Sequence, residues 1–311
     1  MELSPVQRRI RDFYFKDGLG APPEASHVHR AGLVPEQRLF SLERLRHHLN
    51  NPLLDPSYLG LFHDGKAVDL ASAHLYKIVQ RRKVPFLDRR VLQHYLEQGA
   101  ACVLEGLDIL EPEINALAAS LESAQAAMFS NATAFFSQRG NEAYRGHLDT
   151  DDVLVVHVAG EKLWRIHHRQ PPRRVGLTDL DEAQMGPLAA EVTMRPGDVL
   201  YLRSFTPHRV STRSPCSLHV SFDLCDSQPS AELAMKLLLE HYDRDSSPRY
   251  VPPREVLDKL FGLARSAPFE SHLRQVQSTE KAGFVNFRKL IAENRVTHLD
   301  SYIEKADPTR V

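Results

Sequence analysis

The sequence has little of the features that mark several specialised protein classes. Its 311 residues include only 3 cysteines, Cys102, Cys216 and Cys225, without a CxxC pair, which argues against a disulfide framework or a zinc–thiolate site. No apolar run approaches the roughly 20 residues that span a bilayer, and the first 15 residues lack the apolar core of a secretory signal. These absences predict a soluble, cytoplasmic protein without membrane contact.

An excess of charge is also missing. Lys and Arg number 39 and Asp and Glu number 40, so the net charge is -1 and exerts no overall attraction on nucleic acid. We therefore expect no direct nucleic-acid binding, although Arg169, Arg173 and Arg174 could form a local basic patch. The rest of the composition, with 42% hydrophobic and 25% charged residues, is typical of a globular protein.

Helical spacing of apolar residues dominates the first part of the chain. The clearest amphipathic helix is predicted over 110–129, with Pro112 near its start and Ile114, Leu117 and Leu121 on one stripe. After this helix the pattern becomes that of short strands. VLVVHVAGEKLWRIH predicts a hairpin around Ala159-Gly160, EVTMRPGDVLYLR predicts two strands about a Pro-Gly-Asp turn, and SLHVSFDL predicts another strand.

Short strands without intervening helices favour an antiparallel barrel or a double-sheet jelly roll over a parallel α/β sheet. Beyond residue 228 the helical period returns, in 231–242, 253–266 and 284–296, with Ser230 as a candidate N-cap. We therefore predict a mainly β catalytic domain with a helical N-terminal part over 1–228, and a helical domain over 229–311. The apolar stripe of the second domain could form a homodimer interface or pack within the chain.

The main chemical signal is Gly-His-Leu-Asp at 146–149, followed by Thr-Pro-His at 206–208. In a strand, residues i and i+2 project from the same face, so His147 and Asp149 can converge, and His208 can supply a third ligand. Two histidines and one carboxylate form the facial triad that suits nonhaem Fe(II) and oxygen chemistry. Taken singly, each residue could instead be a core histidine, a turn residue or a loop residue.

The stretch HLDTDDVLVVHVAGEKLWRI, followed by RPGDVLYL and TPHRV, resembles the JmjC-type ribosomal oxygenases of the cupin-4 group. The resemblance implies a double-stranded β-helix of the jelly roll or cupin type, with flanking helices and a C-terminal helical domain that dimerises. It also implies an enzyme that uses Fe(II), 2-oxoglutarate and O2 to hydroxylate an unactivated C–H bond. The substrate implied is a protein or peptide side chain, with arginine or histidine of a ribosomal protein as the family expectation.

The same resemblance implies the positions of the site. His147, Asp149 and His208 match the iron ligands, and Lys162 matches the basic residue that binds the distal carboxylate of 2-oxoglutarate. Asn131 resembles an asparagine of the cosubstrate pocket, although its spacing to His147 is about two residues longer, and it could instead cap a strand end. Ser221 could face the pocket, but so could its neighbours.

Three other readings of the same residues stay open. The chain could hydroxylate a small metabolite, demethylate an N-methyl group by the same chemistry, or bind metal as a non-catalytic cupin scaffold. A zinc hydrolase with these ligands fits the GEK and PGD context less well. Arg203 could contact an anionic substrate group or lie on the surface, 168–190 could form a lid or a solvated loop, and Trp164 is expected to pack in the core.

Overall fold

The structure is a computed structural model that describes residues 3–34, 39–63, 65–70, 74–124, 128–138, 143–171, 180–226, 234–235, 237–239, 242, 253–273 and 275. The chain divides into two compact units. One comprises residues 1–124 with 130–225, and the other comprises residues 125–129 with 226–311. None of the described helices is both long enough and apolar enough to cross a bilayer.

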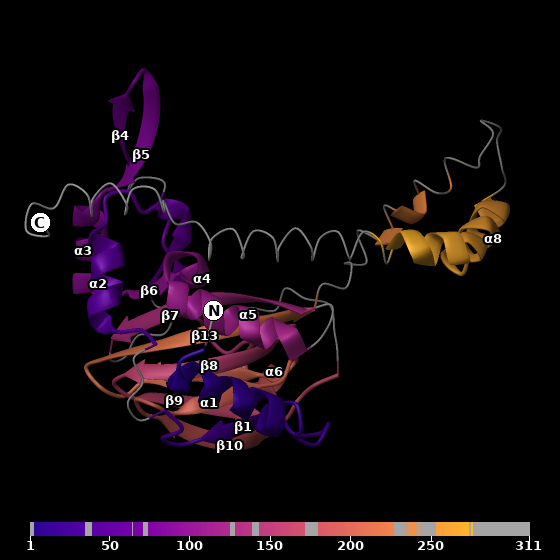
Figure 1. The fold of residues 1–311 in the computed structure, drawn as a ribbon, viewed down its shortest axis with the longest axis horizontal. Coiled ribbons are helices and arrows are strands. Elements are labelled where there is room, and N and C mark those ends of the chain that lie inside the picture. Colours follow the sequence, from indigo (N-terminus) through magenta and orange to yellow (C-terminus); the bar gives the residue numbers. More distant parts are fainter. Residues whose placement is uncertain are drawn as a thin grey trace, which may run out of the picture. The chain divides into compact units, whose positions relative to one another are not determined.

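Short helices and strands alternate in the N-terminal part (Figure 1). In chain order they are α1 (Pro5–Phe13), a π-helical turn (Tyr14–Gly18), β1 (His27–Arg30), α2 (Leu42–Asn50), a 3-10 turn (Pro56–Tyr58), β2 (Leu59–His63), β3 (Lys66–Ala67), β4 (His74–Val79), β5 (Arg82–Leu87), α3 (Arg89–Glu97), β6 (Ala101–Leu104), α4 (Leu107–Leu110) and α5 (Pro112–Leu121). Side chains mark several helix starts, because Ser4, Ser41 and Asp88 each accept a hydrogen bond from a backbone N–H of the first turn.

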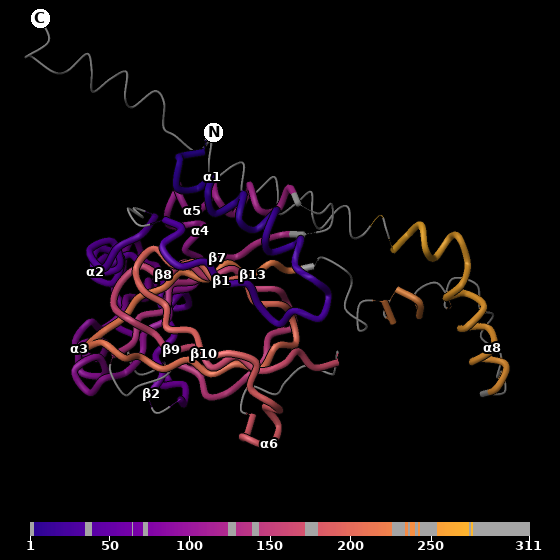
Figure 2. The backbone as a smooth tube through the Cα atoms, turned by 90° about the horizontal axis from the view of Figure 1, so that it is seen from below, coloured from indigo at the N-terminus to yellow at the C-terminus, as the bar shows by residue number. Residues whose placement is uncertain are grey.

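The central strands follow a 3-10 turn at Glu122–Ala124. They are β7 (Met128–Gln138), β8 (Asp152–Ala159), β9 (Lys162–His167), β10 (Leu188–Met194), β11 (Val199–Leu202), β12 (His208–Thr212) and β13 (Cys216–Asp226), with the short helix α6 (Glu182–Met185) before β10. The larger sheet has the order β1-β11-β8-β13-β7-β6-β2-β3, and the smaller one has the order β10-β9-β12. Figure 2 shows these two sheets facing each other, which confirms the predicted double-stranded β-helix.

Apolar side chains from both sheets fill the space between them. The cluster is drawn from β8, β9, β10 and β11 and consists of Val153, Val155, Trp164, Ile166, Val192, Met194, Leu200 and Leu202. The opposite face of the larger sheet is covered by α1, α4 and α5 (Figure 2). Because the central strands have buried neighbours on both sides, long stretches of them are apolar at consecutive positions.

The hairpin predicted around Ala159-Gly160 is wrong, although both of its strands exist. β8 pairs with β11 and β13 in the larger sheet, whereas β9 pairs with β10 and β12 in the smaller one. The chain therefore passes from one sheet to the other at this turn. Gly160 permits the passage, because it has a φ of 69° and a Cβ there would lie 2.0 Å from the carbonyl oxygen of Cys216.

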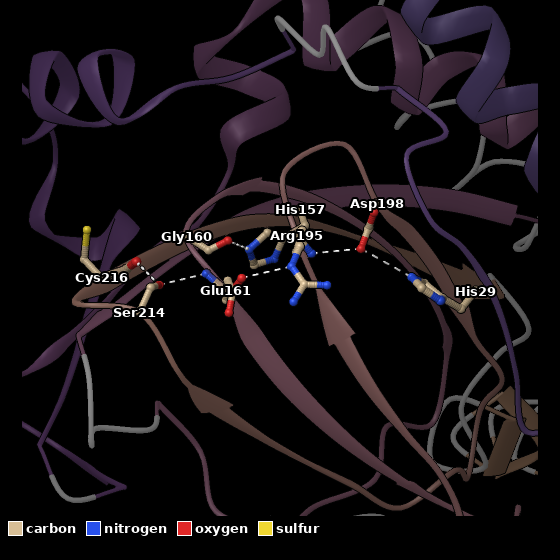
Figure 3. A network of polar contacts seen from close by, with 8 residues as sticks. All are labelled: His29, His157, Gly160, Glu161, Arg195, Asp198, Ser214 and Cys216. Carbon is tan, nitrogen blue, oxygen red and sulfur yellow. Dashed lines mark hydrogen bonds and ion pairs between the residues drawn. The ribbon is translucent and has the colours of Figure 1, made fainter.

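Polar contacts join the turns at one end of the two sheets (Figure 3). In the β8–β9 turn, Glu161 accepts from Arg195 Nε at 2.9 Å, and its backbone N–H donates to Ser214 Oγ at 2.7 Å. The predicted Pro-Gly-Asp turn is confirmed between β10 and β11, where Asp198 accepts from the backbone N–H groups of Arg195 and Gly32. These bonds connect the β8–β9, β10–β11 and β12–β13 turns, and so fix how the sheets meet.

The helix predicted over 110–129 is shorter than expected. Pro112 does begin α5, and Ile114, Leu117 and Leu121 are fully buried as predicted. However, α5 ends at Leu121 and β7 begins at Met128. The run of small and apolar residues after Leu121 suits either structure, and pairing of β7 within the larger sheet decides between them.

The β4–β5 hairpin extends away from the surrounding elements in Figure 1. Its tip has positive φ at Gln80 and Arg81, and Leu75, Tyr76 and Ile78 are exposed. The hairpin contributes nothing to the cavity described below.

The second unit contains α8 (Pro253–Ala264), which confirms the helix predicted from 253. Leu237, Leu238 and Phe269 are buried together within this unit, and residues 234–235 and 237–239 are helical. The helix predicted over 284–296 and the candidate N-cap Ser230 lie outside the described residues.

Candidate metal centre and cavity

Three ligand-type side chains predicted from sequence lie together. Nε2 of His147 is 3.8 Å from Asp149 Oδ1, and Nε2 of His208 is 3.7 Å from Asp149 Oδ2. One ligand atom from each residue lies within 4.8 Å of the other two. This spacing lets the three side chains bind one ion from the same side and leaves its other positions open.

Backbone carbonyls set the tautomer of both histidines. Nδ1 of His147 lies 2.9 Å from the carbonyl oxygen of Arg145, and Nδ1 of His208 lies 3.0 Å from that of Thr206. Because a carbonyl only accepts, each Nδ1 carries the proton, and the lone pair is on Nε2, the atom nearest Asp149. Burial, aided by the neighbouring His147, lowers the pKa of His208 to about 4, so this ring is neutral at pH 7. The donor set therefore fits a divalent metal ion.

Backbone contacts bring the two distant ligand segments together. His147 and His208 form an isolated antiparallel bridge, in which each N–H donates to the other's carbonyl, at 3.0 and 2.8 Å. Phe205, three residues before His208, has a φ of 60° and donates its N–H to the carbonyl of Asp149 at 2.7 Å. Positive φ is costly for a phenylalanine, and such strain is commonly found beside functional sites.

Gly146 has a steric role just before the first ligand. A Cβ at this position would lie 2.8 Å from Sδ of Met185 and 3.2 Å from the carbonyl oxygen of Leu180. The carbonyl of Gly146 also accepts a hydrogen bond from the N–H of Leu180 at 2.6 Å. Glycine at 146 thus allows the segment around α6 to pack directly on the ligand segment.

The ligands open into a cavity of about 320 Å³ between the two sheets. Its walls come mainly from β7, β8, β9, β12 and β13 and from the segment before His147. The lining residues are Glu105, Thr133, Phe135, Ser137, Ala143, Tyr144, His147, Asp149, Val153, Lys162, Trp164, Leu202, His208, Val210, His219, Ser221 and Asp223. This volume suits a small organic molecule together with one inserted side chain.

Lys162 is the first residue of β9 and is only 3% exposed. Its ammonium donates to the carbonyl of Phe135 at 3.2 Å and to Nδ1 of His219 at 2.7 Å. No carboxylate of the described residues forms an ion pair with it, and burial lowers its pKa to about 7. A buried cation without an anionic partner is costly, so the site favours an incoming carboxylate.

The other two residues predicted to line the pocket differ in their positions. Ser221 is buried on β13 and does line the cavity. Asn131 lies on β7 and is half-buried, but it is not among the cavity-lining residues; Thr133, two residues further along the strand, is. Asn131 is about two residues further from His147 than the asparagine of the resembled family. The cavity-lining residue Thr133 is likewise two residues nearer to His147 than Asn131 is.

Acidic residues line another part of the cavity. Glu105 accepts from the hydroxyl of Thr133 at 2.8 Å. Burial raises the pKa of Asp223 to about 7, and the charges of Asp149, Glu105 and Asp151 add to the increase. This part of the cavity therefore favours a positively charged group.

Two residues with open roles in the sequence have definite contacts. Trp164 packs in the core as expected, and its ring also lines the cavity and stacks on His208, with centroids 5.5 Å apart. Arg203 neither lines the cavity nor lies free on the surface, because its Nη2 donates to the carbonyl of Ala21 at 2.8 Å. Of the 168–190 segment, residues 172–179, which include Arg173 and Arg174, lie outside the described residues.

Several cavity residues were missed in the sequence, and alternation would have found some of them. Ser221 was a candidate on a strand of alternating pattern, and the positions two residues to either side of it are His219 and Asp223. Glu105 and Tyr144 had no such signal, because they come from segments outside the motif strands.

Comparison with known proteins finds relatives of the part of the chain that contains this site. A model of the JmjC domain matches residues 109–233. Ribosomal oxygenase 2 of Bos taurus is 23% identical over 172 residues, which are 52% of this chain and 37% of that protein. The bifunctional lysine-specific demethylase and histidyl-hydroxylase NO66 of Drosophila persimilis is 26% identical over 110 residues, 34% of this chain and 16% of that protein. The chain thus spans well under half the length of these relatives.

A solved structure has the same fold. YcfD, a ribosomal oxygenase from Escherichia coli, in complex with cobalt and 2-oxoglutarate, superposes with a TM-score of 0.56 over 83% of this chain and 68% of that chain, at 15% identity. The segment that the family model matches contains the three candidate ligands. This chain is therefore similar to JmjC-domain proteins over residues 109–233, and to the ribosomal oxygenases.

Proposed function

We propose that this protein is an Fe(II)- and 2-oxoglutarate-dependent oxygenase that hydroxylates a C–H bond on a protein or peptide side chain. One observation carries the proposal: two imidazoles and a carboxylate converge at a cavity that also contains a buried lysine, which has no ion-pair partner among the described residues. Such a site offers ligands to one divalent ion and a cationic anchor to a dicarboxylate.

The roles of the chain's own residues follow from their contacts. His147, Asp149 and His208 would hold the iron, and the carbonyls bonded to Nδ1 keep both rings in the ligating tautomer. Lys162 would bind the distal carboxylate of the cosubstrate, with Ser221 on the adjacent wall. When bound, Fe(II) with 2-oxoglutarate activates O2 for oxidation of a C–H bond. The apolar walls, which include Val153 and Leu202, limit the access of water.

The substrate would be a cationic side chain, arginine or histidine. The charge of Glu105 and Asp223 supports this choice, because both line the cavity and neither forms an ion pair with a Lys, Arg or His among the described residues. Tyr144 and Phe135 add aromatic walls next to these carboxylates, with ring centroids 6.1 Å apart. A flat guanidinium or imidazolium suits such a combination of aromatic faces and acidic groups.

Turnover with peptides tests the proposal. Peptides that contain arginine or histidine would be incubated with the protein, Fe(II), 2-oxoglutarate and O2, with succinate followed by NMR and the peptide mass by mass spectrometry. We expect succinate together with a gain of one oxygen atom, and neither product with His208→Ala. Turnover with a small metabolite alone would favour the metabolite hydroxylase, and absence of any turnover despite bound iron would favour the non-catalytic scaffold. The dimer and the cytoplasmic location stay predictions.

A further inference from the structure

His219 is the least expected polar group of the cavity. It lies on β13, two residues before Ser221, and is only 5% exposed. Its ring stacks on Phe135, with centroids 4.9 Å apart and planes inclined by 13°, and lies edge-on to Trp164 at 5.6 Å. These two aromatic neighbours fix the plane of the imidazole.

The contact with Lys162 then fixes the tautomer. In its ammonium form, which a bound carboxylate would favour, Lys162 can only donate, so Nδ1 of His219, 2.7 Å from Lys162 Nζ, accepts that hydrogen bond. The proton of the neutral ring is consequently on Nε2. Among the described residues, Nε2 of His219 has no hydrogen-bond partner, and the residue lines the cavity.

Lys162 has spare donor capacity as well. Two of its three N–H groups are directed at Phe135 O and His219 Nδ1, and one is left over. The Lys162–His219 pair, as we name it from here, therefore presents two N–H donors from adjacent side chains, and neither of these N–H groups meets an acceptor within the described residues. One carboxylate has two oxygens and can accept from both donors.

From this geometry we infer that Nε2–H of His219 is a second binding group for the distal carboxylate of the cosubstrate, acting beside Lys162. The inference rests on the proposed function and adds a residue to its cosubstrate site. Burial lowers the pKa of both members of the pair, and His219 is further disfavoured as a cation by Lys162. The pair thus carries at most one positive charge before a carboxylate arrives.

The test separates the distal carboxylate from the rest of the cosubstrate. The apoprotein would be titrated without oxygen with Fe(II) and either 2-oxoglutarate or 2-oxopentanoate, which has the same chelating end but no distal carboxylate. Binding is followed by the visible charge-transfer band of the iron chelate. His219→Phe keeps a ring between Phe135 and Trp164 and removes both nitrogens, whereas His219→Gln retains an N–H donor.

We expect His219→Phe to lower the affinity for 2-oxoglutarate about 10- to 100-fold, as for loss of a hydrogen bond to a charged group. The affinity for 2-oxopentanoate should stay within about twofold of wild type. The affinity of His219→Gln for 2-oxoglutarate should lie between that of His219→Phe and that of wild type. Equal affinity for 2-oxoglutarate in all three proteins, or equal weakening of both acids, would overturn the inference. Absence of a band from the wild-type protein with either acid would instead overturn the proposed function.

A second measurement needs no variant. In the wild-type protein loaded with diamagnetic Zn(II), the Nε2–H proton of His219 should become protected from exchange and visible by NMR when 2-oxoglutarate is added. 2-Oxopentanoate should not produce this signal. The same spectrum with both acids would contradict a hydrogen bond from His219 to the distal carboxylate.

Discussion

The cavity has a basic region and an acidic region. Their charges are opposite, but in both regions burial makes the charged form of a side chain less favourable. The Lys162–His219 pair forms the basic region, and Glu105 with Asp223 forms the acidic region. β13 contributes to both, because His219 and Asp223 are four residues apart on it, about 13 Å along an extended strand. Ser221 and the three candidate metal ligands line the same cavity.

Burial acts on the two regions in opposite directions. It lowers the pKa of Lys162 from 10.5 to about 7, and it raises the pKa of Asp223 from 3.8 to about 7. In each case the charged form is disfavoured, and a ligand of opposite charge would restore it. One cavity can therefore favour both an anion and a cation when the groups of each sign are kept apart.

The largest expected effect is on metal binding by the candidate ligands His147, Asp149 and His208. His208→Ala removes one of three donors, and we expect the affinity for Co(II) to fall by at least about 100-fold, since even the loss of partners behind a ligand costs 10- to 100-fold. Calorimetric titration measures this affinity. His168→Ala is the control, because His168 is exposed and does not line the cavity. Unchanged Co(II) affinity in His208→Ala would contradict the facial triad.

Lys162→Met tests whether burial of the Lys162 charge lowers the stability of the folded protein. The pKa of Lys162 is lower in the folded protein than in the unfolded chain, so between pH 7 and 10.5 the unfolded state holds more protons, and wild-type stability rises with pH. The variant lacks this gain. In the metal-free protein we expect the free energy of unfolding of wild type, relative to Lys162→Met, to increase by about 2 to 4 kcal/mol from pH 7 to 10. Urea unfolding at both pH values measures it, and a constant difference would show that Lys162 is not desolvated.

Asp223→Asn tests the acidic region, where the change of stability with pH should have the opposite sign. The pKa of Asp223 is higher in the folded state, so between pH 3.8 and 7 the folded state holds more protons, and wild-type stability falls as pH rises. We expect the amide variant of the metal-free protein to gain about 2 to 4 kcal/mol relative to wild type between pH 4 and 7. The same urea series measures this change, and parallel pH profiles of the two proteins would contradict it.

Trp164→Phe should have the smallest effect. The indole Nε1 is buried and has no hydrogen-bond partner in the described part of the chain, so the variant loses packing volume and stacking on His208 but no hydrogen bond seen there. We expect a loss of about 1 to 2 kcal/mol in stability and less than a threefold change in Co(II) affinity, measured by thermal unfolding and calorimetry. A larger loss of metal affinity would show that the ring also orients His208.

The sequence predicted those parts of the site that depend on local spacing. Two ligands separated by one residue, a third ligand after Thr-Pro, and Lys162 after the Gly-Glu turn all lie at the cavity. What it could not predict is which strands pair. Periodicity shows that β8 and β9 are strands, but only tertiary contacts decide that they lie in different sheets. The acidic residue Glu105 reaches the cavity from β6's end for the same nonlocal reason.

Adding Fe(II) and then 2-oxoglutarate to the apoprotein in the absence of oxygen tests whether the protein binds this cosubstrate on iron. We expect a visible charge-transfer band in wild type, no band in His147→Ala, and a band that requires more cosubstrate in Lys162→Met. Iron that binds normally to wild type without giving a band at any concentration of 2-oxoglutarate would contradict this expectation.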